Sequence, residues 1–162
     1  MHLQSPKQKI VKYWVAPVGT DLKLNTDGVY LPNFPLGGTG GVLRDSLGRF
    51  QVGFAARYDF ITSALHSEMM AIQDGLMLAT DMQLHSVMIE SDCLQAVQVI
   101  NSPTQDLSSL GALVANIKGL VSSIPNCCVI HVSRLANVVA HSANLYFEFS
   151  SSLLDQSVKD QN

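Results

Sequence analysis

Turn signals divide the first third of the chain into three strand-like segments. These segments are residues 23–30, 42–44 and 49–57. A glycine-rich link, residues 37–41, leads into the second, and Asp45-Ser-Leu-Gly48 is a turn signal before the third. Consecutive strands joined by such turns usually pair side by side in opposite directions. We therefore expect the chain to begin with an antiparallel meander, which excludes an all-helical fold.

Helical and strand-like segments alternate after the meander. Apolar side chains recur at helical spacing up to about Met82, and Thr62 or Ser63 is the expected cap of that helix. The later predicted elements are a strand at 86–90, helices at 94–100 and 107–121, a strand at 127–132 and a last helix at 137–149. This order, βββαβααβα, predicts an α/β fold with a mixed five-stranded sheet and flanking helices.

The composition fits one packed domain. Of the 162 residues, 47% are hydrophobic and 14% are charged, so a globular core is expected rather than disorder. No apolar run approaches the roughly 18 to 20 residues that span a bilayer, and the first residues lack an apolar signal core. We expect a domain at 14–149, between an N-terminal extension at 1–13 and a polar tail at 150–162. We also expect an intracellular protein, cytoplasmic or nuclear and not secreted.

Three acidic residues lie in three separate predicted elements. Asp27 lies in the first strand, Glu68 in the first helix, and Asp92 directly after the fourth strand. Carboxylates from distant segments converge most easily on a hard divalent cation such as Mg²⁺ or Mn²⁺. Taken singly, Asp27 could serve a turn, Glu68 could face solvent and Asp92 could cap a helix. Together they predict one shared metal site.

Five short motifs, in order along the chain, identify a family. They are Asn25-Thr-Asp-Gly28, Gly40-Gly-Val-Leu-Arg-Asp45, Ser67-Glu68, Glu90-Ser-Asp92 and His131-Val-Ser-Arg134 with Asn137-Val-Val-Ala-His141. None is specific alone, but their order on the predicted elements resembles the ribonuclease H fold. The chain is most similar to the plant ribonuclease H-like domain, which is related to the ribonuclease H part of reverse transcriptases. The resemblance covers roughly residues 14 to 148.

The resemblance implies hydrolysis of the RNA strand of a duplex with two divalent metal ions. By that resemblance, Asp27 would bridge both ions and Glu68 would bind the ion near the leaving group. Asp92 would support the water molecule that attacks. Glu90, two residues before Asp92, is a candidate for a structural or supporting role.

The fourth position of the site departs from the best-known enzymes of the family. His141 stands where those enzymes have an aspartate, four residues after Asn137. A neutral imidazole can ligate a metal or shuttle a proton, but it adds no negative charge. We therefore expect weaker metal binding and a preference for Mn²⁺, unless His141 is only a polar residue on an exposed helix face. Asn25, Arg134 and Asn137 are candidates for contacting the substrate, although Asn137 could instead cap the last helix.

The expected substrate is an RNA-containing duplex, either an RNA/DNA hybrid or double-stranded RNA, because the family reads A-form shape and 2′-hydroxyls. A divalent-metal-dependent endoribonuclease is the first hypothesis, with degradation of viral RNA as one conjectured role. A catalytically silent nucleic-acid-binding or protein-interaction module is the second, and the net charge of −3 favours it. A third is another nuclease or an integrase of the same fold. The surplus of apolar residues is compatible with a homo-oligomer.

Overall fold

A computed structural model describes residues 13–34 and 36–142 and shows one mixed five-stranded sheet. Its strands are β1 (Leu22–Leu31), β2 (Leu36–Arg44), β3 (Phe50–Asp59), β4 (Ser86–Ser91) and β5 (Asn126–His131). The spatial order is β3-β2-β1-β4-β5. The first three strands pair antiparallel, as the turn signals predicted, and β4 and β5 are parallel to β1 and to each other.

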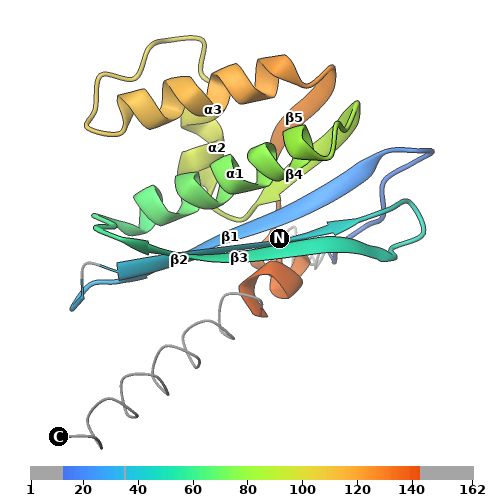
Figure 1. The fold of residues 1–162 in the computed structure, drawn as a ribbon, viewed down its shortest axis with the longest axis horizontal. Helices are drawn as coiled ribbons and strands as arrows, with labels where there is room; N and C mark the ends of the chain where they lie inside the picture. Colours follow the sequence, from blue (N-terminus) through green and yellow to red (C-terminus); the bar gives the residue numbers. More distant parts are fainter. Residues whose placement is uncertain (1–12, 35, 143–162) are drawn as a thin grey trace, which may run out of the picture.

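Three α-helices lie against one face of this sheet (Figure 1). They are α1 (Ala64–Asp81), α2 (Leu94–Asn101) and α3 (Gly111–Ser123). The predicted cap of α1 is Ser63, whose side chain accepts a hydrogen bond from the His66 N–H at 3.0 Å. Apolar side chains from α1 and the central strands form the core; fully buried members include Leu24, Met69, Ile72, Leu76 and Ile89.

The chain then crosses to the other face of the sheet. A short 3₁₀ helix, η1 (Arg134–Ala136), leads into a helical segment that begins at residue 138 (Figure 1). The predicted last helix, 137–149, therefore begins one residue later than expected. Its part beyond residue 142 lies outside the described residues, as do most of the expected N-terminal extension and the whole expected tail.

Two predicted boundaries are wrong by four residues or more. The glycine-rich link at 37–41 is part of β2, which pairs with β1 and with β3, and its glycines leave space for neighbouring side chains. A Cβ atom on Gly41 would lie 2.3 Å from the Phe54 ring, and one on Gly37 would lie 2.7 Å from Ile61. Helix α3 begins at Gly111 rather than at 107. The Ser108 N–H bonds to the Asp106 carboxylate at 2.7 Å, and this turn ends before the helix begins.

Helix α1 lies unusually close to β1, and this close approach builds the site. A Cβ atom on Gly28 would lie 2.3 Å from the backbone of Ser67, and only glycine fits this contact between backbones. A Cβ atom on Gly75 would lie 2.8 Å from the Leu24 side chain. The contact at Gly28 brings Glu68, the residue after Ser67, next to β1. Among the described residues, no helix combines the length and apolarity needed to cross a membrane.

Candidate metal centre

The three predicted acids lie together. A carboxylate oxygen from each of Asp27, Glu68 and Asp92 lies within 4.8 Å of the others. The strand pairing explains two of them: Thr26 pairs with Ser91 between the parallel strands β1 and β4, so the next residues, Asp27 and Asp92, follow side by side. Glu68 reaches them from α1, where its carboxylate accepts a hydrogen bond from the Gly28 N–H at 3.3 Å.

The charge of Glu68 is strongly disfavoured without a counterion. Burial, followed by the negative charges of Asp27 and Asp92, raises the pKa of Glu68 from 4.5 to about 9. The Gly28 N–H and the guanidinium of Arg134 oppose this shift and do not overcome it. A bound cation would remove both the desolvation penalty and the repulsion.

His141 lies beside this cluster. Its Nδ1 is 3.1 Å from Oδ2 of Asp27, and its side chain is 40% exposed, whereas that of Asp27 is 6% exposed. In the tautomer that donates to this carboxylate oxygen, Nδ1 carries the hydrogen and Nε2 keeps its lone pair. His141 therefore borders the acid cluster through Asp27, while the ligand atoms that lie within 4.8 Å of one another belong to the three acids.

The three carboxylates fit a divalent cation. Three convergent carboxylates offer the oxygen donors that Mg²⁺ and Mn²⁺ bind, and an imidazole nitrogen is better tolerated by Mn²⁺. The raised pKa of Glu68 supports the same conclusion, because a cation would stabilise a carboxylate that is otherwise protonated at neutral pH.

The candidate substrate-binding residues fall into two groups. Arg134 is 79% exposed, with its Nε 3.8 Å from Oδ2 of Asp92, so it can meet a phosphate beside the acids. Asn25 and Asn137 are 0% and 1% exposed, and their amides bond inside the protein. Direct contact of these two with a substrate does not fit their burial. Asn137 does not cap the helix through its side chain either, because its Oδ1, the atom that would accept from a helix N–H, accepts from the Asn25 amide at 3.1 Å.

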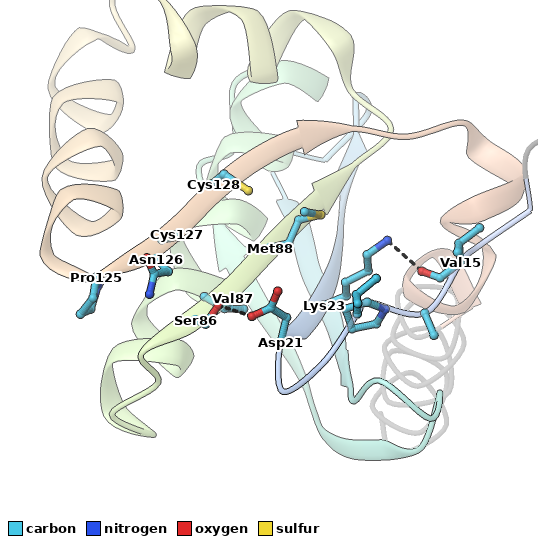
Figure 2. A pocket seen from close by; sticks show the side chains of 13 residues that line it. Val15, Asp21, Lys23, Ser86, Val87, Met88, Pro125, Asn126, Cys127 and Cys128 are labelled. Atoms are coloured by element: carbon cyan, nitrogen blue, oxygen red, sulfur yellow. Dashed lines mark hydrogen bonds between the residues drawn. The ribbon is translucent and has the colours of Figure 1, made fainter.

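A pocket of about 700 Å³ lies elsewhere, and none of the three acids lines it. It is formed at the amino-terminal ends of β1, β4 and β5 together with residues 15–18, whereas Asp92 follows the carboxyl end of β4. In Figure 2 the Lys23 side chain, which lines this pocket, points to the backbone oxygen of Val15; the Nζ–O distance is 2.8 Å. The candidate chemistry is therefore at an open site at the other end of the parallel strands.

Comparison with known proteins agrees with this geometry. The model of the family described as reverse transcriptase-like matches residues 25–144, the stretch that carries all seven candidate residues. The chain belongs to this reverse transcriptase-like family. It is also 30% identical over 149 residues to an Arabidopsis thaliana protein whose name gives ribonuclease H as an inferred assignment. That match covers 91% of this chain and 24% of the other, so the chain spans about a quarter of the length of this curated relative.

Solved structures of low sequence identity share the fold of this family member. Ribonuclease H1 from Halobacterium salinarum is 17% identical, with a TM-score of 0.69 over 76% of this chain and 93% of the other. The N-terminal ribonuclease H domain of a Mycobacterium tuberculosis protein is 15% identical, with a TM-score of 0.69 over 89% and 100%. LC11-RNase H1 in complex with an RNA/DNA hybrid is 19% identical, with a TM-score of 0.60 over 76% and 93%. The predicted ribonuclease H-like fold is confirmed.

Proposed function

We propose that this domain is a divalent-metal-dependent endoribonuclease that hydrolyses RNA within an RNA-containing duplex. The observation that carries the proposal is the convergence of Asp27, Glu68 and Asp92 within 4.8 Å on a ribonuclease H fold. A scaffold has no physical need for three adjacent carboxylates, because their repulsion destabilises the metal-free fold. Family membership makes a hydrolase of the ribonuclease H type the natural reading of that cluster.

Each residue of the site has a role that its position supports. Asp27, buried on β1 beside Glu68, Asp92 and His141, would hold a divalent cation together with the other two acids. Glu68 and Asp92 would hold cations from opposite elements, α1 and the loop after β4. Divalent cations bound there would supply the positive charge that activates a water nucleophile and stabilises the leaving 3′ oxygen. His141 can accept a proton at Nε2, and Arg134 can bind a phosphate oxygen.

The RNA/DNA hybrid is the first proposed substrate, because one structure of the same fold, LC11-RNase H1, is in complex with such a hybrid. Double-stranded RNA has a similar A-form shape and is the second candidate substrate. If double-stranded RNA is the substrate, we propose degradation of viral RNA as the role. We propose a cytoplasmic or nuclear location for this activity.

Cleavage assays with the wild type and Asp92→Asn test the proposal. Labelled RNA/DNA hybrid, double-stranded RNA and double-stranded DNA are each incubated with Mg²⁺, Mn²⁺ or EDTA. We expect metal-dependent cleavage of the hybrid by the wild type and a loss of at least about 100-fold in the variant, as for removal of a group that stabilises the transition state. Wild-type cleavage no faster than that of Asp92→Asn would refute an enzymatic function. Cleavage of double-stranded DNA alone would refute the ribonuclease assignment.

His141 favours one alternative, a binding module without catalysis. An imidazole in place of a fourth carboxylate leaves the site with one negative charge fewer, and the chain has a net charge of −3. Under this alternative the wild type binds a hybrid with equal affinity in EDTA and in Mn²⁺ and does not cleave it. The same assays, followed by a gel-shift measurement of binding, distinguish the two functions.

A further inference from the structure

A chain of hydrogen bonds joins Arg44 on β2 and Glu90 on β4 to Asp92. Asn25, fully buried on β1, donates from Nδ2 to Oε2 of Glu90 at 2.8 Å and to Oδ1 of Asn137 at 3.1 Å. Its Oδ1 accepts a hydrogen bond from the guanidinium of Arg44 at 2.7 Å. Asn137 in turn donates from Nδ2 to the backbone oxygen of Thr26 at 2.9 Å and to Oδ1 of Asp92 at 3.3 Å.

The two ends of this chain determine which way the Asn25 amide points. Arg44 can only donate hydrogen bonds, so the amide oxygen of Asn25 must face it. The Glu90 carboxylate, which forms an ion pair with Lys23 at 2.8 Å, accepts, so the amide nitrogen of Asn25 must face Glu90. Glu90 is itself 2% exposed, and this pairing satisfies its buried charge. If the Asn25 amide were flipped, its N–H groups would face the N–H groups of Arg44, and its oxygen would face the Glu90 carboxylate oxygen.

The orientation of Asn25 then determines that of Asn137. The second hydrogen of the Asn25 amide points at Asn137, so Asn137 must present its oxygen there. Its nitrogen therefore faces the other way, toward Asp92 and the Thr26 oxygen. Both hydrogens of this amide are then used, and one of them is held on a single oxygen of the Asp92 carboxylate.

We propose that Arg44 and Glu90, acting through Asn25, fix the orientation of the Asn137 amide, and that Asn137 is the positioning residue that holds Asp92 ready for metal. This inference rests on the proposed function. An N–H on Oδ1 holds the carboxylate in one rotamer and leaves Oδ2, the oxygen 3.8 Å from Arg134, toward the open side of the site. Hydrogen-bond partners of this kind orient metal ligands and raise the affinity for the ion.

Mn²⁺ binding in the absence of substrate tests the proposal, because it needs no catalysis. We expect Asn137→Ala to raise the dissociation constant for Mn²⁺ roughly 10-fold or more, measured by isothermal titration calorimetry. Glu90→Gln should raise it by a smaller factor, since Lys23 and Asn25 contact different oxygens of Glu90 and glutamine keeps an oxygen at only one of these two positions. Asn101→Ala is the matched control: it also removes an amide donor to a backbone oxygen, that of Val129 at 2.9 Å, but away from the acids.

The outcomes separate this proposal from the proposed function. Suppose that the wild type binds Mn²⁺ and that both variants bind it as tightly as Asn101→Ala does. This result would refute the positioning role and leave the proposed function standing. Wild type that binds no Mn²⁺ would refute both. If Asn137→Ala does not fold, the folded Glu90→Gln variant decides, and an unchanged dissociation constant there refutes the proposal. In hydrolysis assays at saturating Mn²⁺, a positioning role lowers kcat and leaves KM for the hybrid nearly unchanged.

Discussion

Replacing Glu68 by glutamine removes a carboxyl group whose ionisation is opposed by burial and by two neighbouring carboxylates. The folded protein holds the pKa of Glu68 at about 9, against an ordinary value of 4.5. Between these two values the folded protein binds a proton that the unfolded chain has released. The free energy of unfolding of the metal-free wild type must therefore fall as the pH rises through this window.

The size of the effect follows from the same shift. For each pH unit above 4.5, the free energy of unfolding of the wild type falls by about 1.4 kcal/mol, so at pH 7 it is lower by roughly 3 kcal/mol. Glutamine at position 68 has almost the same shape, can still accept a hydrogen bond from the Gly28 N–H, and never ionises. In EDTA we expect Glu68→Gln to equal the wild type near pH 4.5 and to be roughly 3 kcal/mol more stable at pH 7.

Urea unfolding in EDTA at pH 5, 7 and 8.5 measures the difference. The control variant is Asp59→Asn, because that carboxylate is 65% exposed and should leave the pH dependence of the wild type unchanged. Adding Mn²⁺ should then stabilise the wild type and stabilise Glu68→Gln much less. If the free energies of unfolding of the wild type and Glu68→Gln changed in parallel with pH, burial and the neighbouring acids would not be raising the pKa of Glu68. That result would refute the prediction.

Three further predictions concern residues around the acids. His141→Asp places a carboxylate beside Asp27, so the Mg²⁺ affinity should rise roughly tenfold and the preference for Mn²⁺ should shrink, as measured by calorimetry with both ions; equal or weaker Mg²⁺ binding would contradict a ligand position for His141. Gly28→Ala puts a Cβ atom 2.3 Å from the Ser67 backbone, so urea unfolding should show a loss of at least about 2 kcal/mol, and a smaller loss would mean that α1 can move away from β1. Arg134→Ala should change stability by less than about 0.5 kcal/mol, because the side chain is 79% exposed. It should also reduce the slope of log affinity for a hybrid against log salt by about 1 in filter-binding assays, and an unchanged slope would exclude a phosphate contact.

Local patterns along the chain were sufficient for most of the architecture. The turn at Asp45–Gly48 and the Ser63 cap lie where the residues predicted, because both depend on interactions within about four residues. The glycines at 37–41 misled the same reasoning. Their backbone is a strand because it pairs with β1 and β3, and glycines are needed there because Phe54 and Ile61 occupy the space that side chains would need.

The roles of the two buried asparagines could not be read in this way. Asn25 and Asn137 are 112 residues apart, and their side chains meet only because the chain returns to β1 after β5. Side-chain burial depends on the packing of whole elements, so a polar residue near a motif looks the same in sequence whether it faces solvent or the interior. The expectation that both contact a substrate gave way to an interior network for this reason.

The amino-acid sequence by itself determined the order of strands and helices, the motif order that identifies the family, and the three acids as a candidate set. These follow from short-range backbone preferences and from residue identity. Only the tertiary structure decided that Asp27, Glu68 and Asp92 converge, that Glu68 is protonated at neutral pH without a cation, and that Asn137 faces Asp92. The physical reason is that distance, burial and local charge belong to pairs of segments brought together by folding, and none of them is a property of a segment alone.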